Sequence, residues 1–118
     1  MMEIWKRFRF EAAHRLPKTP PTHKCHNLHG HTFTVRMSFV GEVNDDGWLV
    51  DFAEIEKAWL TIKPIIDHRY LNEVPGLENP TSEVIAIWIW NKMREQVPFL
   101  DSVEVKENDD CGAIYRGQ

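Results

Sequence analysis

Two histidines, His29 and His31, stand two positions apart and lead into residues 32–40, where β-branched and aromatic residues alternate with polar ones. This alternation predicts a β-strand, on which every second side chain points to the same face. Both imidazole rings are therefore expected to lie beside an apolar surface. Same-face neighbours on a strand are roughly 6 to 7 Å apart, which allows two rings to reach one metal ion at about 2.0 to 2.1 Å.

A third histidine, His14, follows a predicted strand over residues 4–10 and has the parity of its apolar residues. If the extended conformation continues, the ring of His14 lies on the core side as well. Three neutral nitrogen ligands without a carboxylate are typical of catalytic zinc sites, which keep one coordination position open. The sequence therefore predicts a Zn²⁺ site formed by His14, His29 and His31.

Cys25 lies four residues before His29, at the end of a proline-rich loop over residues 17–27. Three interpretations of Cys25 are open. It is either a fourth zinc ligand that closes a structural site, or a reactive nucleophile or base, or a plain buried thiol. The ordinary pKa of a thiol is about 8.5, so it acts as a base at neutral pH only beside cations or an imidazole. His23 and His26, in the same loop, have no partner pattern and are interpreted as loop residues.

Two further features carry ionisable groups in unusual places. His68 directly follows Asp67 in a non-helical segment, and a carboxylate in that position can fix the tautomer of a proton-shuttling ring. The alternative is a loop histidine beside a helix-capping aspartate. Glu107 has the parity of the apolar residues in the predicted strand over residues 102–107. It is either a strand-end charge that reaches solvent or a specific binder of a ligand.

The 118 residues are expected to form one domain, residues 1–118, with a modest core. The net charge of −4 argues against non-specific binding to nucleic acid or to an acidic membrane. Residues 1–37 nevertheless carry seven Lys or Arg against two Glu, a net +5, which suits a small anionic substrate or is the charge of ordinary solvated strands. Without a long apolar run or a signal-peptide pattern, the chain is expected to be soluble and cytoplasmic.

The remaining patterns predict an α+β fold. Asp51 caps a helix that Pro64 should kink or end, and Pro80 stands in the first turn of a second helix that runs to about residue 95. Further strands are predicted over residues 48–50, 102–107 and 111–116. Strands grouped at both ends of the chain favour an antiparallel four-stranded sheet with two helices on one face. Assembly is expected to cover the other face and the sheet edges.

Several motifs, spread over nearly the whole chain, resemble the 6-pyruvoyltetrahydropterin synthase family. They are Phe10-Glu11-Ala12-Ala13-His14, Cys25-x3-His29-Gly30-His31, Asp51-Phe52, Leu71-Asn72, Asn79-Pro80-Thr81-Ser82-Glu83, Lys106-Glu107 and Ile114-Tyr115-Arg116-Gly117. The resemblance implies a tunnelling fold. It also implies that trimers close a β-barrel, that two trimers stack into a homohexamer, and that active sites lie between subunits.

The resemblance further implies roles for single residues. Zinc would be bound by the three histidines, and Cys25, Asp67 and His68 would transfer protons. Glu107 would bind the amino-pyrimidine edge of a pterin, and the segment of Thr81 and Ser82 would contact the same ring.

Chain length and the three-residue spacer between Cys25 and His29 are similar to the bacterial 6-carboxy-5,6,7,8-tetrahydropterin synthases of queuosine biosynthesis. The implied substrate is 7,8-dihydroneopterin triphosphate. The alternatives on the same fold are synthesis of 6-pyruvoyltetrahydropterin and cleavage of the dihydroneopterin side chain. An alternative of another class is a non-catalytic zinc-binding module in which Cys25 closes the metal site.

Overall fold

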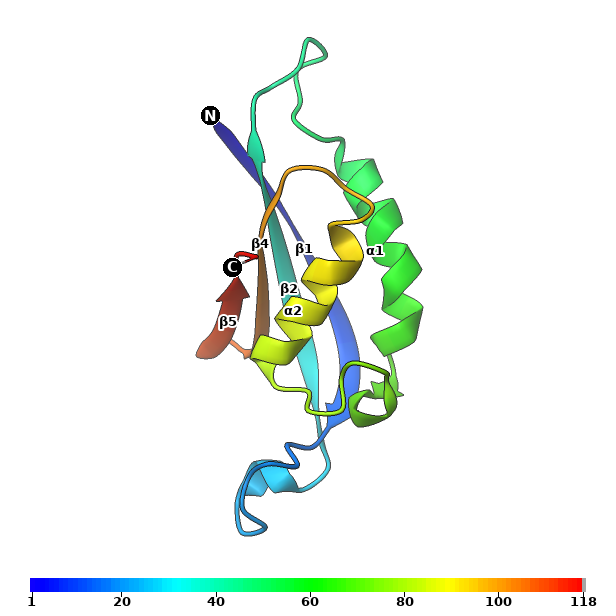
Figure 1. Ribbon diagram of the computed structural model, residues 1–118, viewed down its shortest axis with the longest axis vertical. Coiled ribbons are helices and arrows are strands. Elements are labelled where there is room, and N and C mark those ends of the chain that lie inside the picture. The colour runs from blue at the N-terminus through cyan, green and yellow to red at the C-terminus, as the bar shows by residue number, and fades with distance from the viewer. Residues whose placement is uncertain (118) are drawn as a thin grey trace.

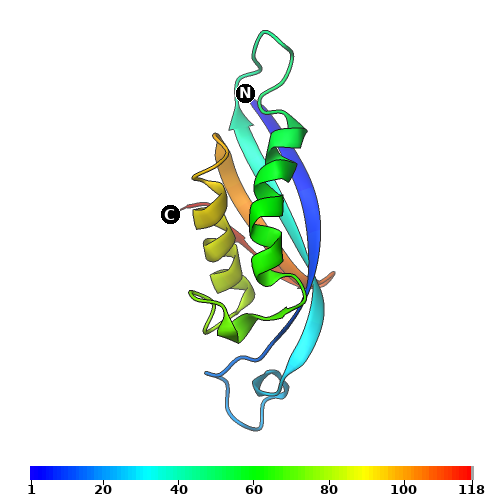
Figure 2. The same cartoon turned by 90° about the vertical axis from the view of Figure 1, so that its right-hand side faces the viewer.

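The computed structural model describes residues 1–117 and contains one sheet with the strand order β3-β1-β2-β4-β5. The strands are β1 (Met2–His14), β2 (His29–Gly41), β3 (Arg69–Tyr70), β4 (Leu100–Asn108) and β5 (Cys111–Tyr115), and the helices are α1 (Phe52–Ile66) and α2 (Ser82–Met93). Both helices pack on the same face of the sheet (Figures 1 and 2). The predicted α+β architecture with two helices on one face is confirmed. The strands β1, β2, β4 and β5 form the predicted four-stranded antiparallel sheet, and β3 is a fifth strand that pairs in parallel with β1.

The two long central strands pair along their entire length, from Met2 opposite Gly41 to His14 opposite His29. Their inward side chains alternate with exposed ones, as the sequence pattern requires. Phe10 and Phe33 are fully buried and stack with ring centroids 4.8 Å apart. This pairing matters for function because it carries all three predicted zinc ligands to the same end of the sheet.

The two helices begin where their capping residues predict. Asp51 Oδ1 accepts a hydrogen bond from the Ala53 N–H at 2.9 Å, and the Thr81 hydroxyl accepts one from the Val84 N–H at 3.1 Å. Pro64 lies inside the last turn of α1, which ends two residues later. Pro80 precedes the cap of α2 and so does not occupy its first turn, which corrects the sequence-based prediction.

Two details of the predicted sheet differ from the structure. Residues 48–50 do not form a strand, because they pair with no strand of the sheet. Leu49 and Val50 form bends and are buried in the core immediately before α1, whereas Trp48 is exposed. The two-residue strand β3 was not predicted, and it adds a parallel edge beside Ala12 and Ala13 of β1. It leaves the remainder of the β1 edge unpaired among the described residues.

The second face of the sheet remains uncovered within the chain. Trp5 and Ile114 point from this face and expose 48% and 54% of their surface. Exposed aromatic and aliphatic side chains on an open sheet favour burial by another protein surface. Neither α1 nor α2 has the length and hydropathy that crossing a membrane demands, and the same is true of every other helix in residues 1–117.

Candidate metal centre and substrate cavity

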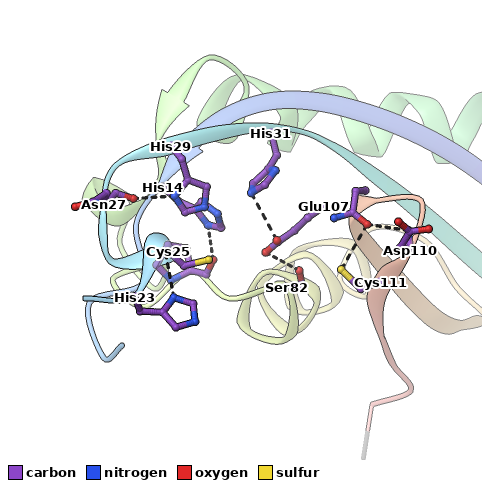
Figure 3. Close-up of polar contacts among 12 residues, drawn as sticks. His14, His23, Cys25, Asn27, His29, His31, Ser82, Glu107, Asp110 and Cys111 are labelled. Atoms are coloured by element: carbon purple, nitrogen blue, oxygen red, sulfur yellow. Dashed lines mark hydrogen bonds and ion pairs between the residues drawn. The ribbon is translucent and has the colours of Figure 1, made fainter. Parts of the chain in front are cut away.

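Three histidines converge at the end of the central strand pair. The β-sheet register places His14 opposite His29, and Ala12 opposite His31, so that all three rings emerge on the helix-covered face. The ring centroids are 4.6 Å apart for His14 and His29, 5.2 Å for His14 and His31, and 4.9 Å for His29 and His31. One candidate ligand atom from each residue lies within 4.8 Å of the other two, and Figure 3 shows the rings gathered beneath the strands.

Backbone carbonyl groups fix the orientation of two of these rings. His14 Nδ1 lies 2.8 Å from the Pro80 carbonyl oxygen, and His29 Nδ1 lies 2.7 Å from that of Asn27. A carbonyl oxygen can only accept, so each Nδ1 must carry the proton and each Nε2 must present its lone pair. This is the arrangement in which metal-binding histidines are usually held.

Two ring nitrogens of the cluster have no hydrogen-bond partner. His14 Nε2 and His31 Nε2 are buried and have no hydrogen-bond partner in the structure. A buried polar atom without a partner costs about 1 to 3 kcal/mol, so a missing ligand is the natural explanation. The donor set of three imidazoles therefore fits a divalent metal ion of the kind that prefers nitrogen ligands.

Burial favours the neutral, metal-binding form of two of the rings, those of His14 and His31. Burial lowers the pKa of His14 below its ordinary value of 6.5, and the neighbouring His29 and His31 act in the same direction, although the Pro80 carbonyl opposes them. Burial also lowers the pKa of His31, against the opposing effect of Glu107. Both rings are therefore neutral at pH 7. For the same reason the 3.6 Å contact between His31 Nε2 and Glu107 Oε2 is not an ion pair at that pH.

The metal-free protein is expected to lose stability as the pH falls from about 7 to about 5. In this window the unfolded histidines bind protons near a pKa of 6.5, whereas folded His14 and His31 bind them only at lower pH. The unfolded chain then holds more protons, so the free energy of unfolding decreases. Urea denaturation at both pH values measures the change. His31→Ala should make this decrease with pH smaller, and His26→Ala should leave it unchanged. If the free energy of unfolding of the wild type is the same at both pH values, the lowered pKa values of His14 and His31 are wrong.

Glu107 stands beside the histidine cluster and not at the solvent. Its Oε1 accepts a hydrogen bond from the Ser82 hydroxyl at 3.1 Å, and its side chain is 21% exposed. Figure 3 shows the carboxylate between Ser82 and His31. Glu107 and Ser82 also line a cavity of about 440 Å³, together with Thr81 and Cys111. A cavity of this size is typical of small-molecule sites, and Glu107 places a half-buried carboxylate in its lining.

Cys25 lies near the cluster without joining it. It is half-buried in the short 3₁₀ turn Lys24–His26, and its N–H donates to His23 Nδ1 at 3.0 Å. Figure 3 shows Cys25 on the same side of the sheet as the ring of His14. Within residues 1–117, the group of mutually close ligand atoms consists of the three histidines and does not include the Cys25 sulfur. The thiol itself is free.

Asp67 and His68 lie against the edge of β1, at Glu11. Asp67 Oδ1 accepts the Glu11 N–H at 2.9 Å, and the His68 N–H donates to the Glu11 carbonyl. Burial acts to raise the pKa of Asp67, but the hydrogen bonds from Glu11 and His68 prevail and hold it below 3.8. His68 Nδ1 is 3.0 Å from Asp67 Oδ2, and the histidine side chain is 77% exposed.

The structure therefore confirms the close contact of Asp67 with His68 but does not bring either residue into the histidine cluster of the same chain. His68 has a positive φ of 58°, a backbone conformation that histidine tolerates better than most residues. The ring of His68 is therefore directed towards solvent.

Sequence reasoning missed the carbonyl groups that orient the rings, those of Asn27 and Pro80. Backbone acceptors leave no direct signal in a sequence, because any residue can supply them. The indirect signal is Pro80 itself, which lacks an N–H and stands just before a helix cap. Its carbonyl is free for His14 because residues 78–80 form no regular ladder.

The chain is similar to known proteins over nearly its whole length. The family model for 6-pyruvoyl tetrahydropterin synthase matches residues 3–118. The 6-carboxy-5,6,7,8-tetrahydropterin synthase of Synechocystis sp. is 44% identical, with 98% of this chain and 93% of the relative covered. The dihydroneopterin monophosphate aldolase of Pyrococcus furiosus is 35% identical, with 75% of this chain and 72% of the relative covered.

A solved structure, the 6-pyruvoyl tetrahydropterin synthase of Caenorhabditis elegans, superposes with a TM-score of 0.91 at 27% identity and covers 99% of this chain and 96% of its own. The tunnelling fold implied by the sequence motifs is thereby confirmed. Since the match extends from the first strand to the last and includes each histidine of the cluster, the chain belongs to the 6-pyruvoyl tetrahydropterin synthase family.

Proposed function

We propose that this protein is a zinc-dependent lyase that converts 7,8-dihydroneopterin triphosphate and water to 6-carboxy-5,6,7,8-tetrahydropterin, acetaldehyde and triphosphate, in queuosine biosynthesis. The observation that carries the proposal is the convergence of three histidines, two of which have buried nitrogens without a partner, next to Glu107, which lines a cavity. The relative from Synechocystis, which is named for this product, supports the choice of reaction.

His14, His29 and His31 would bind the zinc ion through neutral nitrogens, the ligand set that leaves the ion its full positive charge. A zinc ion bound there would supply a Lewis acid next to the hydroxyl groups of the substrate's side chain, which acidifies the adjacent C–H bonds. The remaining chemistry falls to residues of the chain.

Glu107 would hold the pterin ring in register. Its carboxylate can accept hydrogen bonds from a ring N–H and from the exocyclic amino group, a paired and charge-assisted contact. The Ser82 hydroxyl, 3.1 Å away, restricts the rotation of the carboxylate before the substrate arrives. Thr81 lies on the same cavity wall, so the start of α2 forms the second side of the proposed pterin site.

Cys25 and the pair Asp67 and His68 would move the protons. The Cys25 thiolate would take a proton from the activated side chain of the substrate. His68, oriented by the Asp67 carboxylate at 3.0 Å, would return a proton to the pterin ring. The ring is reduced while the side-chain carbon is oxidised, so this redox step needs no nicotinamide.

The proposed active site joins two copies of the chain. His68 stands at the exposed edge of β1, which β3 covers only at Ala12 and Ala13. Pairing of the uncovered edge with another subunit would close the barrel, bury the open sheet face and bring an exposed His68 to a neighbouring cluster. We therefore propose a homohexamer built from two trimers. The proteins would be soluble in the cytoplasm, with a pterin triphosphate as their small-molecule partner.

Incubation of zinc-loaded protein with 7,8-dihydroneopterin triphosphate tests the proposal. Mass spectrometry of the products should detect 6-carboxytetrahydropterin and acetaldehyde in equal amounts. A lack of any turnover by the zinc-loaded protein would refute the enzymatic proposal.

Aldol cleavage of the side chain, which forms no carboxylate, is the second candidate, because the relative from Pyrococcus furiosus is named as an aldolase. The same incubation distinguishes the two, since the aldol cleavage yields a hydroxymethyl pterin and no acetaldehyde. Formation of 6-pyruvoyltetrahydropterin would be recognised by a product that retains all the side-chain carbons. If the protein is a non-catalytic zinc-binding module, none of these pterin products should form.

Glu107→Ala is expected to weaken pterin binding by at least about tenfold, because hydrogen bonds to a charged group contribute about 1.5 to 3 kcal/mol. Titration with a pterin, followed by fluorescence, measures the affinity, and thermal melting measures the effect on folding. Glu104→Ala is the matched control, since Glu104 lies on the same strand but points to the opposite face. Equal pterin affinity in both variants would contradict the role of Glu107.

A further inference from the structure

Residues 67–72 run alongside the last part of β1, the part that ends in His14. Asp67 and His68 are bonded to Glu11, and β3 then pairs in parallel with residues 12 and 13. The backbone pairing ends at residue 13, and beyond it the side-chain amide of Asn72 forms hydrogen bonds with the backbone of Arg15. The Arg15 N–H donates to Asn72 Oδ1 at 3.0 Å, and Asn72 Nδ2 donates to the Arg15 carbonyl at 2.9 Å.

The same amide also reaches the segment before α2. Asn72 Nδ2 donates a second hydrogen bond to the Glu78 carbonyl at 3.3 Å. Two residues further along, the Pro80 carbonyl accepts the bond from His14 Nδ1 at 2.8 Å. Asn72 thus connects the residue that follows His14 with the segment that holds the ring of His14. All three of its donor and acceptor groups are used in this connection.

We propose that Asn72 is a positioning residue of the metal centre. By fixing the end of β1 to residues 78–80, it keeps the Pro80 carbonyl in reach of His14 Nδ1 and so keeps His14 Nε2 directed at the cluster. This inference rests on the proposed metal-binding function. Loss of a hydrogen-bond partner of a metal-binding histidine costs about 10- to 100-fold in metal affinity. Asn72 acts through Arg15 and Glu78, so we expect a loss near the lower end.

Two variants at this position separate the contacts. Asn72→Ala removes every contact of the amide. Asn72→Asp has the same shape and keeps the acceptor for the Arg15 N–H, but it places an oxygen against two carbonyl groups. Both variants should bind zinc about tenfold more weakly than the wild type, as measured by competition with a chelating dye. The aspartate variant should be at least as weak as the alanine variant, because the two donated hydrogen bonds become repulsive contacts.

Gln96→Ala is the matched control. The Gln96 amide also bridges two segments, since it donates to the Thr61 hydroxyl at 2.9 Å and to the Lys92 carbonyl at 3.4 Å, but it has no contact with the metal centre. This variant should lose stability without losing zinc affinity. If the Asn72 variants bind zinc as tightly as the wild type, the inference is wrong. If the wild type itself does not bind zinc, the proposed function is wrong.

A measurement on the wild-type protein tests the inference even if the Asn72 variants do not fold. If Asn72 couples the end of β1 to the metal centre, then zinc should slow hydrogen exchange at the Arg15 amide. The control is the Asp46 amide, which is also held by an asparagine side chain, Asn44 Oδ1 at 2.9 Å, but lies in the loop after Gly41, at the end of β2 opposite to His29. Slower exchange at Arg15 alone supports the inference, and an equal response of the two amides overturns it.

Discussion

The His31→Ala variant is expected to lose zinc, with an affinity reduced by more than the roughly 100-fold that a lost partner of a metal ligand can cost. His31 Nε2 is buried without a hydrogen-bond partner, so its removal takes away a ligand and leaves two imidazoles that cannot enclose an ion. The fold should survive, since the side chain is 24% exposed and lies at the end of the sheet. Elemental analysis of the purified variant measures the zinc content directly.

His26→Ala is the control for this result. Its ring lies close in sequence but is bonded through Nδ1 to the Thr19 carbonyl at 3.1 Å, away from the cluster. The control variant should keep one zinc ion per chain, and zinc should raise its melting temperature as it does for the wild type. If His31→Ala also retains a full complement of zinc, His31 is not a ligand.

The Cys25→Ala variant is expected to keep zinc and pterin affinity but to lose about 10²- to 10⁴-fold in turnover, the usual contribution of a general base. The thiol is free and its sulfur is not part of the histidine cluster in the described chain. Its loss should therefore leave the metal ligands intact. Turnover is followed through acetaldehyde release, and zinc content and pterin affinity are measured on the same preparation.

Cys25→Ser refines this test because it keeps the size of the side chain and removes the acidic thiol. A base role predicts that serine is nearly as inactive as alanine at neutral pH, since a hydroxyl group does not ionise there. Loss of zinc from Cys25→Ala would favour a structural metal site closed by sulfur. Unchanged turnover in both variants would show that Cys25 is a plain thiol without a catalytic role.

The parts of the fold that follow from local patterns were predictable. The alternation from His29 to Phe39 determines a strand and its buried face, and Asp51 marks a helix start because its side chain can bond the second helical N–H. Residues 48–50 share the strand pattern but pair with no strand, and of the three only Leu49 and Val50 turn into the core. The strand β3 consists of two residues held by backbone pairing, and backbone pairing has no sequence signature.

The candidate site likewise has features that the sequence predicts and features that it does not. Parity along the two long strands predicts that His14, His29 and His31 lie on one face, and the register of the strands brings them together. The parity of Glu107 likewise predicts that it points inwards. The orienting carbonyl of Pro80 and the bridging amide of Asn72 depend on how loops meet strands in three dimensions. Such contacts arise from tertiary packing, and no local pattern encodes them.

Zinc-edge X-ray absorption spectroscopy of the purified protein would show whether the three histidines hold zinc in an open site. We expect three nitrogen ligands and one oxygen ligand at about 2.0 to 2.1 Å, with no sulfur, in the wild type and equally in Cys25→Ala. A zinc–sulfur distance of about 2.3 Å in the wild type that disappears in Cys25→Ala would contradict an open catalytic site.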